Sequence, residues 1–77
     1  MSDEVKQLER MIEVIVRMIP VERRARDVYQ KTAASTDSKK NRILFEHLAN
    51  QEAEHLTKLM AALRILQDEL EVAKKTG

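Results

Sequence analysis

The sequence predicts an all-α fold, an antiparallel hairpin of two long helices that dimerises into a four-helix bundle. Charged residues make up 35% of the 77 residues, whereas glycine and proline occur once each, and this composition is typical of long helices. Apolar residues recur at alternating intervals of three and four along most of the chain, which is the spacing of a helix-packing seam. A single polar cluster, residues 34–38, interrupts this pattern and predicts the turn between the helices.

We expect one domain spanning residues 1–77, because so short a chain has little core of its own unless a metal or a partner helps. The absence of cysteine excludes disulfides and thiolate metal sites. The longest apolar run, from Met11 to Ile19, is too short to cross a bilayer and is not preceded by a basic segment. We therefore expect a soluble, cytoplasmic protein. A net charge of +1 gives no general attraction to membranes or nucleic acid, and we expect neither as a partner.

The first helix is expected over about residues 3–34, capped by Ser2 or Asp3 and kinked near Pro20. Its seam consists of Val5, Leu8, Ile12, Ile15 and Ile19 and continues in phase through Glu22, Arg26, Tyr29 and Ala33. Further apolar side chains widen this seam until nearly half of the circumference is apolar. A two-helix hairpin cannot cover so wide a face, so the sequence predicts a partner surface.

The loop is expected at residues 35–37 and the second helix at about 38–74, with Asp37 as its cap and Lys74, Lys75 and Gly77 as C-terminal signals. The seam of this helix is predicted to consist of Phe45, Leu48, Leu59, Ala62 and Leu66, with Glu52 and His55 at the two positions between Leu48 and Leu59.

Burying Glu52 and His55 costs several kcal/mol in order of magnitude unless the two side chains find partners. Their spacing places a carboxylate and an imidazole one turn apart on one face, which suits a metal ion. Alternatively, the pair forms a polar layer that sets the packing register.

Glu22 is expected at the same level of the hairpin, because it lies roughly 18 Å from the turn and Glu52 roughly 21 Å from it. Glu22, Glu52 and His55 therefore form half of a dinuclear carboxylate site, which a twofold dimer completes. The alternative is an ion pair between Glu22 and Arg26, one turn further along. Tyr29 serves either as an aromatic plug or as a hydrogen-bond donor to a ligand.

These residues resemble the ferritin-like superfamily, in particular its rubrerythrin and encapsulated-ferritin branches. The resemblance rests on the pattern Glu22-x-x-Ala25-x-x-x-Tyr29, then Ser35-Thr36-Asp37, then Leu48-Ala49-x-x-Glu52-x-x-His55. It implies a two-helix half-bundle that dimerises around two iron ions, with Glu22, Glu52 and His55 as ligands and Tyr29 beside the centre. It further implies a homodimer or higher homo-oligomer and an encapsulating shell protein as partner. The chain lacks the cysteine site of rubrerythrins.

The function expected from the spacing and the resemblance together is a di-iron protein, a candidate ferroxidase that oxidises Fe(II), and manganese would use the same ligands. One alternative is a metal-free helical interaction module with a buried polar layer. Another is anion or nucleic-acid binding by the turn end, where basic residues outnumber acidic ones. His47 and Glu54 are expected on the surface.

Overall fold

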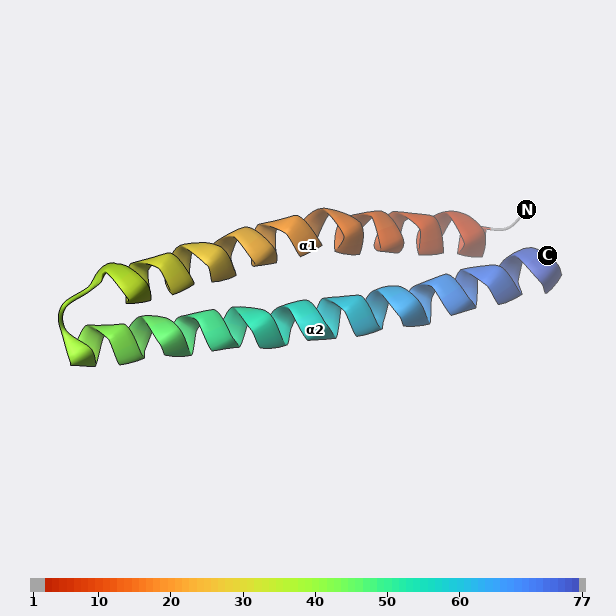
Figure 1. The fold of residues 1–77 in the computed structure, drawn as a ribbon. Helices are drawn as coiled ribbons and strands as arrows, with labels where there is room; N and C mark the ends of the chain where they lie inside the picture. The colour runs from red at the N-terminus through yellow and green to blue at the C-terminus, as the bar shows by residue number, and fades with distance from the viewer. Residues whose placement is uncertain (1–2, 77) are drawn as a thin grey trace.

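The computed structural model describes residues 3–76 and consists of two antiparallel helices (Figure 1). Helix α1 spans Asp3–Ser35, helix α2 spans Lys39–Thr76, and the described part of the chain contains no strand. The predicted all-α hairpin is confirmed. Ser2 and Gly77, which we expected to help to cap the helices, lie outside the described residues.

Helix α1 begins with Asp3 and Glu4, whose negative charges interact favourably with the positive end of the helix dipole. It passes through Pro20 as one helix and does not stop and restart there. Proline removes one helical hydrogen bond and is ordinarily costly inside a helix. Because Pro20 is exposed, its ring does not disturb the packing against α2.

The turn is held by short-range hydrogen bonds that cap α2. The backbone NH of Asn41 donates to Ser38 Oγ at 3.3 Å, so Ser38, rather than the expected Asp37, is the capping residue. The guanidinium of Arg42 donates to the carbonyl of Thr36 at 3.2 Å. In the last turn of α2, the positive charges of Lys74 and Lys75 interact favourably with the negative end of the helix dipole.

Each helix packs against the other through a single seam of buried and half-buried residues. The seam of α1 is the predicted one, since all of its positions are buried or half-buried. The seam of α2 differs from the prediction, because Ala49 and Leu56 are buried there and His55 is exposed. The observed α2 seam consists of Phe45, Ala49, Glu52, Leu56, Leu59, Leu63, Leu66, Leu70 and Ala73.

The molecule is long and thin, with extents of 58 × 14 × 11 Å and a radius of gyration of 17.5 Å. A compact domain of this length would have a radius of gyration of about 11.5 Å. The end of the hairpin opposite the turn, here called the open end, holds a cluster of buried apolar residues, where Val5, Leu8 and Ala73 pack together. Elsewhere most seam residues are only half-buried. Within residues 3–76, neither helix has the length and apolar character needed to cross a membrane.

Candidate metal centre

Glu22 of α1 meets Glu52 and His55 of α2 in the middle part of the hairpin, as the spacing predicts. In the described chain, these three side chains are the group of histidine and carboxylate residues close enough to hold one metal ion. The two carboxylates lie on the seams that join the helices. His55 follows Glu52 by three residues, so its ring lies over the edge of the seam.

The ligand atoms lie at distances that suit a shared ion. His55 Nδ1 lies 3.6 Å from Glu22 Oε2 and 3.7 Å from Glu52 Oε2, and all three atoms lie within 4.8 Å of one another. Two donors bound at about 2.1 Å to one ion lie about 3.0 Å apart at a right angle and about 3.4 Å apart at a tetrahedral angle. The observed separations are somewhat longer than these values, so the side chains would have to move closer together around one ion.

The carboxylates are only partly exposed, and one of their oxygens lacks a partner. The side chains of Glu22 and Glu52 are each 19% exposed, against 57% for His55. Glu22 Oε2 is buried and accepts no hydrogen bond from any described residue. A buried oxygen without a hydrogen bond costs about 1–3 kcal/mol. The contact to His55 Nδ1 at 3.6 Å is too long for a hydrogen bond, so it does not satisfy this oxygen.

Without a bound ion the two carboxylates compete for a proton. The neighbouring Glu22 carboxyl, to which the protonated form of Glu52 can donate, raises the pKa of Glu52, and burial and the negative charge of Glu22 act in the same direction. His55 acts in the opposite direction. When two acids lie this close, ionisation of one disfavours ionisation of the other, unless a cation takes the place of the proton.

The donor set, two carboxylates and one imidazole, fits a divalent ion such as Fe(II), Mn(II) or Zn(II). Three protein donors leave the remaining coordination positions open. His55 is the exposed member of the group, so the group is accessible to solvent on its side.

Two neighbouring side chains behave differently from the ligand group. Arg26 pairs with Asp27 at 3.3 Å, and not with Glu22, so the alternative ion pair of Glu22 is not formed. Tyr29 contacts Phe45 across the hairpin, with ring centroids 6.2 Å apart. Within the described chain its hydroxyl makes no hydrogen bond to the ligand group. Tyr29 acts here as an aromatic plug, roughly 10 Å along the helix from Glu22.

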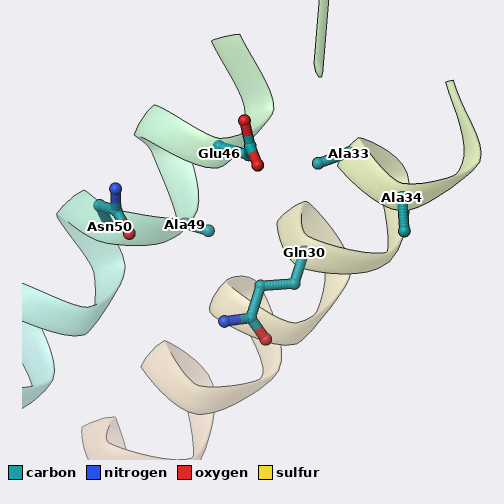
Figure 2. A pocket seen from close by; sticks show the side chains of 6 residues that line it. All are labelled: Gln30, Ala33, Ala34, Glu46, Ala49 and Asn50. Atoms are coloured by element: carbon teal, nitrogen blue, oxygen red, sulfur yellow. The ribbon is translucent and has the colours of Figure 1, made fainter. Parts of the chain in front are cut away.

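The remaining histidine and the acid beside the site lie outside this group. His47 and Glu54 are both exposed, as we expected. A hollow of about 500 Å³ lies beside the turn (Figure 2). Among its lining residues Glu46 is the one carboxylate, which is too few to hold a metal ion. Ala33, Ala49, Gln30 and Asn50 also line the hollow. Ligand geometry, rather than cavity volume, therefore locates the candidate centre.

The sequence pattern alone missed the position of His55 relative to the hairpin seam. A competing seam is visible in the sequence, because Ala49, Leu56, Leu63 and Leu70 repeat every seven residues beside Phe45, Glu52 and Leu59, but periodicity alone does not choose between the two seams.

Comparisons with protein families, with curated proteins and with solved structures found no match for this chain. The candidate site therefore rests on the residues and on their geometry.

Proposed function

We propose that this chain is a di-iron carboxylate protein of the ferritin-like type, which binds metal through Glu22, Glu52 and His55 and oxidises Fe(II). A homodimer in the form of a four-helix bundle completes the centre by placing the same three residues of a second copy opposite the first set. The observation that carries the proposal is the buried Glu22 Oε2, which has no hydrogen-bond partner in the described chain and lies 3.6 Å from His55 Nδ1.

A metal ion between the carboxylates would resolve two unfavourable features at once. It would provide a partner for Glu22 Oε2, and it would replace the proton for which Glu22 and Glu52 compete. A purely structural polar layer pairs this buried oxygen only if Glu22 and Glu52 share a proton, and otherwise leaves it unpaired. This difference favours metal binding over the metal-free interaction module.

The side chains of the hairpin suit ferrous iron as substrate. Carboxylate-rich ligation favours the ferric over the ferrous state, and an iron centre supplies the one-electron exchange with dioxygen or peroxide as acceptor. Ile19 and Leu59 lie on the two seams next to the carboxylates and are half-buried, so they limit access of water from within the hairpin. Manganese would be held by the same donors.

The test is anaerobic loading with Fe(II), followed by elemental analysis and native mass spectrometry of the same sample. We expect about two irons per dimer, a stoichiometry that Glu52→Gln abolishes. Glu54→Gln is the matched control, because Glu54 is an exposed acid two residues away. Admission of oxygen should then consume Fe(II), as measured with a ferrous-specific chelator. A folded dimer that takes up no metal and melts identically with and without chelator would instead establish the interaction module.

A further inference from the structure

The hollow beside the turn is formed by both helices and lies apart from the metal-ligand group (Figure 2). It is lined by Gln30, Ala33 and Ala34 of α1 and by Glu46, Ala49 and Asn50 of α2. Glu46 precedes His55 by nine residues, and nine helical steps of about 100° bring the two side chains to opposite sides of α2. A partner that reaches the metal ligands from the side of His55 therefore leaves the hollow open.

Small side chains on both seams account for the space. Ala33 and Ala49 are the buried seam residues at this level of the hairpin, whereas the neighbouring seam positions carry the rings of Tyr29 and Phe45, which contact one another. The hollow measures about 500 Å³, and sites for small molecules commonly measure roughly 300–1,000 Å³. It is therefore large enough for a ligand that consists of a polar group on a short alkyl chain.

The polar side chains around the hollow are not engaged with the rest of the hairpin. Within residues 3–76, the side chains of Gln30, Glu46 and Asn50 make no hydrogen bond and no ion pair. Arg42 lies one turn before Glu46, a spacing at which opposite charges on a helix commonly pair. Its guanidinium instead donates to the carbonyl of Thr36 at 3.2 Å. The Glu46 carboxylate is therefore left beside the hollow without a counter-ion from the described chain.

The chemistry of the lining favours a cation that has several hydrogen-bond donors. Among the lining residues Glu46 carries the one charge, and Gln30 and Asn50 add two side-chain carbonyl oxygens as acceptors. A guanidinium has five N–H donors in one plane and binds a carboxylate through two parallel hydrogen bonds. It is also less strongly hydrated than an ammonium group. It therefore loses less hydration on entering a hollow that alanine methyl groups partly line.

We propose that this hollow binds an alkylguanidinium group, with Glu46 as its counter-ion. The side-chain carbonyls of Gln30 and Asn50 accept hydrogen bonds from the remaining N–H groups, and the alanine side chains contact the alkyl chain. Because the hollow lies apart from the metal-ligand group, the proposal does not depend on the function proposed above. A small guanidino compound and an arginine side chain of another protein present the same group, and the experiments below distinguish them.

The first test titrates the chelator-treated protein with three probes of equal length and follows the NMR signals of individual residues. Butylguanidinium should shift the side-chain amide signals of Gln30 and Asn50, with a Kd on the order of 1 mM. Butylammonium should bind several-fold more weakly, because its charge is more strongly hydrated, and the neutral isostere butylurea should give no saturable shift. Equal binding of butylurea would overturn the role of Glu46. Shifts at His55 without shifts at Gln30 and Asn50 would place the guanidinium in the metal-ligand group and would overturn the proposal.

The second test repeats the butylguanidinium titration with variants at exposed positions, which should leave the fold intact. Glu46→Gln keeps the shape of the side chain and should weaken binding at least ~10-fold, because hydrogen bonds to charged groups are the stronger ones. Gln30→Leu removes one acceptor and should weaken binding about two- to tenfold. Glu54→Gln is the matched control, since Glu54 is likewise an exposed acid of α2 without an ion pair in the described chain, and it should leave binding unchanged. An equal loss in Glu46→Gln and Glu54→Gln would show non-specific attraction and would overturn the site.

A last comparison identifies the source of the guanidinium group. The probe N-acetyl-arginine amide carries the same group on a peptide backbone. If it binds with the affinity of butylguanidinium, the hollow accepts an arginine side chain of a protein partner. If it binds more than ~10-fold more weakly, the backbone does not fit, and the site takes a free guanidino compound. Iron uptake by the Glu46→Gln variant should equal that of the parent protein, so the metal centre and the hollow are tested separately. Absence of saturable binding by both guanidinium probes would overturn the proposal.

Discussion

Replacing Glu22 by glutamine should have opposite effects on the metal-free and on the metal-loaded protein. The substitution keeps the shape of the side chain but removes one charge and gives it an NH₂ group that can donate to Glu52. In the metal-free hairpin it relieves the unpaired Glu22 Oε2 and the competition with Glu52. The cost of an unpaired buried group is about 1–3 kcal/mol. Because the side chain is 19% exposed, we take the low end and expect a gain of about 1 kcal/mol.

In the proposed centre, the same change also removes a metal ligand. Loss of a residue that merely orients a ligand weakens metal binding about 10–100-fold, so loss of a ligand should cost at least ~100-fold. At a free metal concentration of about 100 times the Kd, binding stabilises the native protein by about 2.7 kcal/mol. With a Kd ~100-fold weaker, that stabilisation falls to about 0.4 kcal/mol. The variant should therefore be the more stable protein in chelator and the less stable one, by about 1.3 kcal/mol, in metal.

The assay is thermal unfolding followed by circular dichroism, with and without metal, at one fixed protein concentration. For a domain of this size each kcal/mol corresponds to about 4–8 °C in Tm, so the crossing is measurable. Glu54→Gln should shift neither curve. A Glu22→Gln variant that melts lower in chelator, and whose metal-induced rise in Tm equals that of the parent, would refute the argument. Glu22 would then stabilise the hairpin without binding metal.

Three further predictions concern acidity, Pro20 and the open end. Because the folded-state pKa of Glu52 is raised, protonation favours the folded state, so the stability of the metal-free protein should decline as pH rises through that pKa. A metal-saturated sample should gain stability over the same pH rise, because metal binds the deprotonated carboxylates. If the stabilities with and without metal changed with pH in the same way, Glu52 would not be a ligand. Pro20→Ala should raise the Tm, because alanine restores a helical hydrogen bond and proline costs up to ~3 kcal/mol in a helix interior; an unchanged Tm would mean that α1 already accommodates the ring. Leu8→Ala should lower the free energy of unfolding by about 2–5 kcal/mol, since Leu8 is 3% exposed; denaturant unfolding measures this, and a loss below 1 kcal/mol would mean that the open end is loosely packed.

The helices and the ligand group were predictable because each depends on short-range spacing. One polar cluster separates two periodic segments, so the position of the turn follows from the sequence. Once the turn is known, the constant rise per residue places Glu22 level with Glu52. The identity of the cap was less predictable, because Asp37 and Ser38 both favour that position and only the geometry of the Asn41 NH distinguishes them.

The exposure of His55 could not be predicted, because α2 has two overlapping seams. Phe45, Glu52 and Leu59 belong to both. One seam adds Ala49 and Leu56, and the other adds Leu48 and His55. The two residues of each pair are seven positions apart. Each seam is compatible with packing against α1, so periodicity does not decide between them. The structure places the purely apolar addition inside the hairpin.

That choice has a physical reason which bears on function. Within a single hairpin, the seam with Ala49 and Leu56 buries methyl groups at no polar cost, whereas inward rotation of α2 would bury the His55 ring beside two carboxylates. Leaving His55 at the edge keeps its ring hydrated in the monomer. The same position keeps Nδ1 within 3.7 Å of both carboxylates, where an ion could be bound. The ring thus needs burial only when a metal and a second copy offset its desolvation, so metal binding and dimerisation should each strengthen the other.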